Sequence, residues 1–249
     1  MAEKVGAGVS TGLSAFYGHL VPSPLDSFAE GDFLPLTQYH SNQCILVNTA
    51  GRRFMDESLG DDYANQDVFR QPERRAVLIA DERIRREYVV TAPFEQGEAV
   101  DRFERAADAG ARFIGERTLD RLATRVAAWG VNGSALLRTL RDDRRLADPP
   151  FYALEVQPTI TFPHGGLLID GDGRVVDRDG RWIPGLYAAG ADVGGVFNRG
   201  YAGGLAAALV FGRRAGRAAA DWAADRQSGR ILEMRRPLIQ TAPRERYVS

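Results

Sequence analysis

The chain has 249 residues, of which 44% are hydrophobic and 26% are charged, a composition typical of a globular protein with one large domain or two smaller ones. Its 32 basic and 33 acidic residues leave a formal net charge of −1, which excludes the strongly basic surface of a nucleic-acid-binding protein. The single cysteine, Cys44, excludes an internal disulfide and predicts a reducing, cytoplasmic location. The apolar run "LAAALVF", which begins at Leu205, is too short to span a bilayer.

Residues 1–14 are small and glycine-rich, and the first regular pattern follows in "QCILVNTAGRRFMDE". Residues 44–47 form an apolar run typical of a short strand, residues 48–51 are turn-forming types, and residues 53–55 are expected to return as the second strand of a hairpin. Further along, "RRAVLIADERIRREY" predicts a buried strand over residues 76–80 and a helix whose N-cap is Asp81.

Two helices are predicted next. The first, in "ERTLDRLATRVAAWG", begins after Thr118 as its N-cap and ends at Gly130, and the second lies in "NGSALLRTLRDD". Apolar residues recur at helical spacing in both: Leu119, Leu122, Val126 and Trp129 in the first helix, and Leu136, Leu137 and Leu140 in the second. The middle of the chain is therefore predicted to be α+β, with a helical pair that packs against the rest.

From residue 163 onward the pattern predicts strands, glycine turns and one long helix. "GGLLIDGDGRVVDRDGRWIPGLYAAG" indicates a strand, an Asp-Gly turn, a second strand, a loop and a third strand. "GGLAAALVFGRRAGRAAADWAAD" indicates a helix that is opened by Gly203 and Gly204 and has Leu209 on its apolar side. A helix start without side chains lets a ligand approach N–H groups that carry partial positive charge. A plain close-packed helix start is the alternative interpretation.

Several short motifs do not carry their usual chemistry here. "GVSTG" matches a nucleophile elbow around Ser10, but an elbow needs a central strand before it, and seven residues cannot supply one. "GAGVSTG" has the wrong glycine spacing for a dinucleotide-binding turn. The three histidines, His19, His40 and His164, are far apart and lack the spacing of metal ligands. The sequence therefore predicts no metal site.

The motifs "IPGLYAAGADVGG" and "YAGGLAAALVFGRRAG" resemble the C-terminal signature of the fumarate reductase/succinate dehydrogenase flavoprotein family, which includes 3-ketosteroid and tricarballylate dehydrogenases. The resemblance extends back through "FYALEVQPTITFPHGGLLID" and "ILVNTAGRRFMDE" to "FYGHLVP". It implies an α/β fold with an α+β insertion: an FAD-binding, Rossmann-like domain interrupted by a capping domain. By resemblance, residues 1–14 and 163–226 belong to the FAD-binding domain, residues 15–162 form the capping domain, and residues 227–249 are a tail.

The resemblance implies FAD as the cofactor and two places that contact it. One is the turn after "GLYAAG", at Gly190, Ala191 and Asp192, where the family usually has an acid directly after the final glycine. Here Ala191 holds that place and the acid follows one residue later. The other is the helix start at Gly203, Gly204 and Leu205, which resembles the helix start aimed at the flavin ring. The family's first βαβ unit, with its G-x-G-x-x-G turn, has no counterpart, so the FAD-binding domain is expected to be incomplete.

The resemblance also implies residues for proton transfer. Arg85, in "LIADERIR", falls where soluble fumarate reductases keep an acid arginine, and an arginine in that role needs a relay to reprotonate it. Glu57 matches one relay position, although the arginine expected three residues later is Gly60. A surface helix position is the alternative interpretation of Arg85.

Three further residues are expected at the substrate. His19 stands where the family has a histidine for a substrate carboxylate, and Tyr201 stands where fumarate reductases have an arginine for the second carboxylate, with Arg199 two residues away. Residues 161–162 stand where the fumarate reductases have a histidine pair. Tyr201, with glycines near it on both sides, resembles the corresponding residue of the ketosteroid and tricarballylate dehydrogenases more closely. Packing roles are the alternatives for His19 and Tyr201.

These observations predict the capping and C-terminal part of an FAD-dependent oxidoreductase. Hydride would move between flavin N5 and a carbon–carbon bond next to a carbonyl or carboxylate of a small molecule. The alternatives are a catalytically inactive remnant that binds a small acid or a partner, and a fragment that needs a separate N-terminal FAD-binding half. An incomplete sheet exposes apolar surface, which favours such a half or a homo-oligomer as the partner. No nucleic acid and no membrane is expected.

Overall fold

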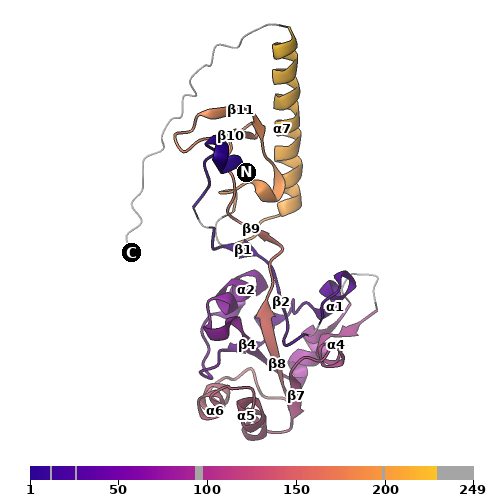
Figure 1. The fold of residues 1–249 in the computed structure, drawn as a ribbon. Helices are drawn as coiled ribbons and strands as arrows, with labels where there is room; N and C mark the ends of the chain where they lie inside the picture. The colour runs from indigo at the N-terminus through magenta and orange to yellow at the C-terminus, as the bar shows by residue number, and fades with distance from the viewer. Residues whose placement is uncertain (12, 26, 93–97, 198–199, 229–249) are drawn as a thin grey trace. The chain divides into compact units, whose positions relative to one another are not determined.

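In the computed structural model, the chain divides into two compact units, which are described separately (Figure 1). The structure describes residues 1–11, 13–25, 27–92, 98–197 and 200–228. Unit 1 comprises Met1–Phe16 and Phe162–Ser249, and unit 2 comprises Tyr17–Thr161. A two-stranded pair, β1 (Phe16–Tyr17) with β9 (Phe162–Pro163), lies where the chain passes from one unit to the other. The expected domain boundaries lie beside these divisions, while the assignment of the units to an FAD-binding and a capping part stays a prediction.

Unit 2 is built on an antiparallel sheet whose central strand is β8 (Phe151–Pro158). On one side β8 pairs along its length with β4 (Ala76–Asp81), which in turn pairs with β3 (Ile45–Val47). On the other side two short strands share the edge of β8: β7 (Phe113–Glu116) lies opposite its first half and β2 (Leu20–Pro22) opposite its second half.

The sheet of unit 2 is buried on both faces because alternate residues of its strands pack against different helices. One face packs with α2 (Asp61–Phe69) and α4 (Arg102–Asp108), and its apolar cluster includes Leu46, Leu78 and Leu154. The other face packs with α5 (Leu119–Ala127) and α6 (Gly133–Arg141), and its cluster includes Ile79 and Ala153. All six residues of β4 are buried, which explains the continuous apolar run of its first five residues; the sixth is the buried Asp81.

Short elements complete unit 2. Its 3₁₀ turns are η2 (Glu30–Asp32), η3 (Ser41–Gln43), η4 (Glu57–Leu59) and η5 (Pro72–Arg74). Its other short pieces are α1 (Phe33–Leu36), α3 (Glu82–Ile84), the π turn η6 (Arg85–Val89), and the pair β5 (Val90–Thr91) with β6 (Val100–Asp101).

The predicted helix caps and the predicted helix end in unit 2 are confirmed. Asp81 accepts a hydrogen bond from the backbone N–H of Ile84, Thr118 accepts one from Arg121, and Gly130 has φ of +83° after α5. The predicted hairpin is much smaller than expected, because its return strand is reduced to a single bridge between Val47 and Arg53. β3 pairs instead with β4, which buries all three of its apolar residues.

Unit 1 contains an antiparallel hairpin and a long helix. The hairpin joins β10 (Arg174–Val176) to β11 (Trp182–Tyr187), and single bridges add Val9, Leu167 and Val193 beside it. The unit also contains η1 (Ala2–Val5), η7 (Gly190–Asp192) and α7 (Gly204–Gln227). No helix in the described part of the chain is long and apolar enough to cross a membrane.

One face of α7 is apolar and exposed. Ala215 is its single buried residue among those described, whereas Leu205 is 87% exposed and Leu209 is 64% exposed. Leu209 was expected on the apolar side of the helix. The residue lies on an apolar face, but nothing in the described part of the chain covers that face.

Candidate functional site

In unit 1, the glycine-rich residues that the sequence assigns to a cofactor lie in η7 and at the start of α7. Gly190 has φ of +66°, and the side chains of Ala191 and Asp192 are exposed. The Asp192 carbonyl accepts a hydrogen bond of 2.8 Å from the backbone N–H of Leu167, which ties η7 to the preceding segment. The backbone of the turn is therefore held in place while its acidic side chain remains accessible.

The N-terminus of α7 has the features of an anion-binding helix start. Its N-cap, Gly203, has φ of +98° and, as a glycine, supplies no side-chain cap to the first N–H groups of this 24-residue helix. A Cβ on Gly204 would lie 3.0 Å from the ring of Phe162, so a larger residue would not fit without movement of that ring. These residues fit a flat or anionic group that binds to backbone N–H donors.

Aromatic side chains of unit 1 gather beside this helix start. The ring of Tyr201 lies 5.9 Å from the rings of Phe162 and Phe197, measured between centroids, and His164 lies 5.5 Å from Phe197. His164 is buried, whereas Tyr201 is exposed. Arg199 lies outside the described residues.

In unit 2, His19 joins a second polar cluster. Its Nδ1 lies 2.6 Å from a carboxylate oxygen of Asp61, and its Nε2 lies 2.9 Å from the hydroxyl of Tyr17. The His19 side chain is buried and packs edge-on against the ring of Tyr39, with 4.8 Å between centroids.

Helix α2 positions this cluster. Asp61 and Asn65 are four residues apart and share one face of the helix; Asp61 contacts His19, and Asn65 exchanges hydrogen bonds with the backbone of Thr159. Thr159 in turn donates to the carbonyl of His19 at 2.7 Å. A Cβ on Gly18 would overlap the Thr159 carbonyl, so only glycine allows this approach.

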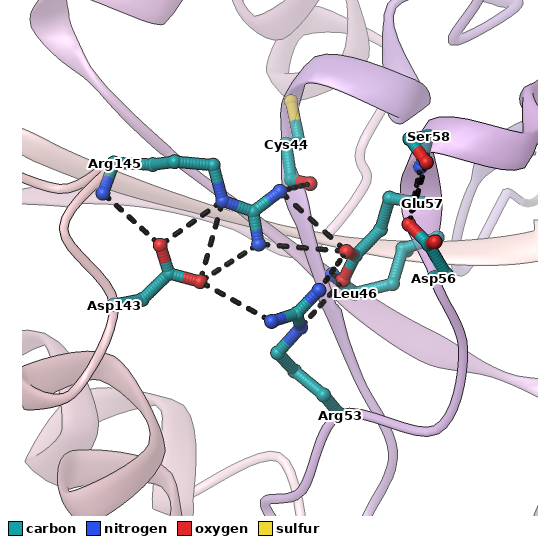
Figure 2. Close-up of polar contacts among 8 residues, drawn as sticks. All are labelled: Cys44, Leu46, Arg53, Asp56, Glu57, Ser58, Asp143 and Arg145. Carbon is teal, nitrogen blue, oxygen red and sulfur yellow. Dashed lines mark hydrogen bonds and ion pairs between the residues drawn. The ribbon is translucent and has the colours of Figure 1, made fainter.

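The structure places Glu57 in a different network of unit 2, which shares no residue with the His19 cluster. Its carboxylate is fully buried and accepts hydrogen bonds from the backbone N–H of Leu46 at 3.0 Å and from Arg53 (Figure 2). Arg145 lies 3.4 Å from the same carboxylate and pairs with Asp143 at 2.7 Å. The hydrogen bond to Asp143 is the largest influence on the pKa of the Arg145 guanidinium and raises it; burial lowers this pKa, and the nearby charge of Glu57 raises it again, so it lies above its ordinary value.

Arg85 is the centre of a third cluster. Its guanidinium pairs with Asp101, with Glu104 at 2.8 Å and with the hydroxyl of Tyr152 at 3.3 Å. Burial lowers the pKa of the Arg85 guanidinium, but the contacts with Asp101 and Tyr152 together outweigh burial and leave the pKa raised. The contacts of Arg85 and Glu57 involve different residues, so the structure does not bring the expected acid and relay together.

Sequence reasoning missed the two residues that hydrogen-bond to the ring of His19. Tyr17 stands two residues before His19 in an extended segment, where alternate side chains point the same way, so "FYGH" contains a usable signal. Asp61 is 42 residues away and no local pattern connects it to His19.

Comparison with known proteins places this chain in a family. A model described as "FAD binding domain" matches residues 1–206. The fumarate reductase (cytochrome) of Shewanella frigidimarina is 28% identical over 213 residues, which cover 78% of this chain and 34% of that protein. The NADH:acrylate oxidoreductase of Vibrio harveyi is 33% identical over 197 residues, covering 71% of this chain and 18% of that protein.

The fold also resembles that of a solved structure. The 3-ketosteroid Δ1-dehydrogenase of Sterolibacterium denitrificans matches with a TM-score of 0.64 and 23% identity, over 88% of this chain and 45% of that one. The chain thus spans less than half the length of the relatives it matches. The architecture is that of part of an FAD-binding flavoenzyme.

Proposed function

This chain belongs to the FAD binding domain family, and we propose that it is the capping and C-terminal part of an enzyme that oxidises or reduces a carbon–carbon bond next to a carbonyl or carboxylate. The family relationship makes the chain part of an FAD-dependent oxidoreductase. The observation that carries the proposal is the glycine start of α7, which has no side-chain cap and lies beside the exposed Tyr201.

The residues of unit 1 fit FAD. The first N–H groups of α7, at Gly204 and Leu205, would hold the flavin, and the exposed turn at Ala191 and Asp192 would contact the chain that joins the flavin to its phosphates. When bound, FAD supplies the two-electron chemistry of the reaction through hydride transfer at N5. The positive end of the α7 dipole would stabilise negative charge at this place.

Tyr201 supports a ketone or enone as the substrate class. A phenol can donate one hydrogen bond to a carbonyl oxygen that gains negative charge, which is the requirement of an enone or ketone rather than of a dicarboxylate. A guanidinium can bind a carboxylate in bidentate fashion, so the proposal also admits a keto acid or a mono-acid, with Arg199, which lies outside the described residues, as the partner of the carboxylate. Matched relatives act on fumarate, acrylate and 3-ketosteroids, and these three compounds form the natural test panel.

Arg85 and Glu57 are the remaining candidates for proton transfer. The acid partners of Arg85, Asp101 and Glu104, support a structural role in joining η6 to β6 and α4, because Arg85 already pairs with both carboxylates within unit 2. Arg85→Ala in the flavin-loaded enzyme separates the two roles. A sharp loss of turnover with flavin retained supports the acid role, and unchanged kinetics removes Arg85 from the site.

The exposed apolar face of α7 supports a further part of the FAD-binding domain as the partner, in the same polypeptide or in a separate one. Leu205, Leu209 and Val210 are all exposed on it, and an apolar patch of this kind is usually covered. We expect the 249-residue chain alone to bind FAD weakly and the completed domain to bind it stoichiometrically. Stoichiometric yellow protein from the chain alone would contradict this proposal. The single buried thiol, Cys44, is compatible with a cytoplasmic location.

The deciding experiment uses the flavin-loaded enzyme with fumarate, acrylate and a 3-ketosteroid. Tyr201→Phe should keep the flavin but lose at least about tenfold in kcat with a carbonyl substrate, the scale of a lost oxyanion donor. Arg199→Ala should affect only the acidic compounds. Efficient fumarate turnover together with a silent Tyr201→Phe would refute the substrate class, and absence of turnover in every arm would favour a binding module of the same family.

A further inference from the structure

A cavity of about 480 Å³ lies between the hairpin β10–β11 and the second half of α7, within unit 1. Two glycines with positive φ let the hairpin approach the helix closely. A Cβ on Gly173 would lie 2.7 Å from the Cβ of Ala215, and a Cβ on Gly185 would lie 3.1 Å from the ring of Trp222. The hairpin is therefore packed tightly against α7 beside the cavity, and the cavity has the size of a small-molecule site.

Three aromatic rings form the apolar wall of the cavity. The ring of Trp182 lies 6.0 Å from that of Trp222 and 6.3 Å from that of Tyr187, measured between centroids. The Tyr187 hydroxyl donates to the carbonyl of Ala218 on α7 at 3.2 Å, which fixes its ring. The buried indole N–H of Trp182 has no hydrogen-bond partner among the residues that the structure describes. These rings offer contact area to a flat apolar body, and the indole N–H is a donor for a ligand oxygen.

Arginines form the polar wall of the cavity. Arg174 pairs with Asp172 at 2.5 Å and with Asp170 at 3.5 Å, and Arg214 pairs with the same Asp172 at 3.2 Å. Arg217 also lines the cavity, but its guanidinium forms no ion pair within the described part of the chain. A guanidinium stays protonated and binds a carboxylate in bidentate fashion. The polar wall therefore has one positive charge, on Arg217, that a ligand carboxylate would neutralise.

Two acidic residues lie further along α7. Asp221 and Asp225 are one turn apart, both line the cavity, and neither forms an ion pair with a described residue. Asp225 follows Arg217 by about 12 Å along the helix axis. Because like charges repel, these carboxylates disfavour a second negative group on a ligand that binds to Arg217. The charges of the cavity thus favour a ligand with a single carboxylate.

The cavity is separate from the other exposed features of α7. Arg217 lies about 20 Å along the helix axis from the helix start at Gly204. At about 100° per residue, Ala218 and Asp225 lie on the side of α7 roughly opposite Leu205 and Leu209. A partner that covers the two leucines therefore approaches the helix from the other side.

We propose that this cavity is a binding site for a flat aromatic monocarboxylate. Arg217 binds the carboxylate, and the rings of Trp182 and Trp222 contact the aromatic body. The site goes beyond the proposed function, because it is assigned to neither the flavin nor the oxidised or reduced compound, and its test needs no turnover.

The first test is NMR of the 249-residue chain with ¹⁵N-labelled tryptophan, titrated with 2-naphthoate. The chain has three tryptophans, and Trp129→Phe and Trp222→Phe assign their indole resonances. We expect the Trp182 indole N–H resonance to shift and to saturate with a Kd of about 1 mM or tighter. Trp129 is in unit 2 and is the internal control, so its resonance should not move. The absence of a saturable shift at Trp182 overturns the proposal.

Three related probes test the chemical class of the ligand. Acetate lacks the ring, naphthalene-2-carboxamide lacks the charge, and naphthalene-2,6-dicarboxylate adds a second carboxylate. Each should bind at least about tenfold more weakly than 2-naphthoate. Equal affinity of the carboxamide overturns the assignment of a carboxylate, and equal affinity of the dicarboxylate overturns the restriction to a single one.

A pair of variants tests the role of Arg217. Arg217→Gln should weaken 2-naphthoate binding at least about tenfold, as expected for a lost charge-assisted contact. Arg213 is on the same helix and is also exposed, but it is not among the residues that line the cavity. Arg213→Gln should therefore stay within about twofold of the wild type. Far-UV circular dichroism checks that both variants are folded, and wild-type affinity in folded Arg217→Gln overturns the site.

Discussion

Replacing Glu57 by Gln tests what the network of Figure 2 does for the protein. The substitution keeps the size of the side chain and one carbonyl oxygen, so the hydrogen bond from the Leu46 N–H can persist. It removes the negative charge that faces Arg53 and Arg145, and it brings an amide N–H₂ toward their donors. Two charge-assisted interactions of a fully buried carboxylate are lost at once.

The magnitude follows from how well each partner can return to water. A hydrogen bond to a charged group contributes about 1.5–3 kcal/mol. The side chains of Arg53 and Arg145 are 40% and 32% exposed, so both can be rehydrated and the lower part of that range applies to each. We therefore expect a loss of about 3 kcal/mol in the free energy of unfolding. For a chain of this size that loss lowers Tm by on the order of 10 °C.

Urea and thermal denaturation followed by circular dichroism measure this loss, with Asp56→Asn as the control. Asp56 neighbours Glu57 and accepts from the Ser58 N–H, but it is exposed, and Asn keeps a capping oxygen. No measurable change is expected for the control. A Glu57→Gln variant as stable as the wild type would refute a structural role. If the stable variant also lost turnover in the flavin-loaded enzyme, Glu57 would instead belong to a proton relay.

Three further outcomes are expected. Gly51→Ala should lower the free energy of unfolding by at least about 2 kcal/mol in urea denaturation, because the φ of Gly51 is +72° and a Cβ would lie 2.5 Å from the backbone N of Leu136. Gly6 is the control: its φ is also positive, but a Cβ there would meet nothing, so Gly6→Ala should lose less stability. Burial, with a smaller contribution from Arg102, lowers the pKa of His40 from about 6.5 to about 3. The unfolded chain therefore binds a proton that the folded chain excludes, and stability should fall as the pH falls from 6.5 to 3, by up to about 1.4 kcal/mol per pH unit, with a smaller slope in His40→Gln. Burial raises the pKa of the Cys44 thiol, so a thiol reagent should label it only on unfolding; rapid labelling of the native chain would contradict its burial.

Local signals in the sequence predicted the elements well because their physics is short-range. The caps at Asp81 and Thr118 are hydrogen bonds to N–H groups three residues away, and the stop at Gly130 needs only a positive φ. The continuous apolar run of β4 indicates burial on both faces, and the structure buries every one of its residues. The glycine start of α7 was also visible in the sequence, since a helix start and its missing side chains are adjacent.

Local signals did not predict the partners of the candidate site residues, because these partners are distant in the sequence. His19 meets Asp61 because antiparallel pairing of β2 with β8 brings residue 19 beside Thr159, which α2 holds through Asn65. Glu57 meets Arg145 across 88 residues for a similar reason: the segment after α6 returns to the start of β3, where Arg145 donates to the carbonyl of Cys44.

The sequence by itself determined the family, the kinds of elements and their caps, because these depend on residue types at fixed short spacings. Only the tertiary structure decided which charges pair. In the structure, Glu57 pairs with two arginines and Arg85 pairs with separate acidic residues. Leu209 is exposed on α7. Such contacts join residues that are distant in the chain, and their free energies depend on burial and on the pairing of strands. Neither quantity is encoded in any one segment.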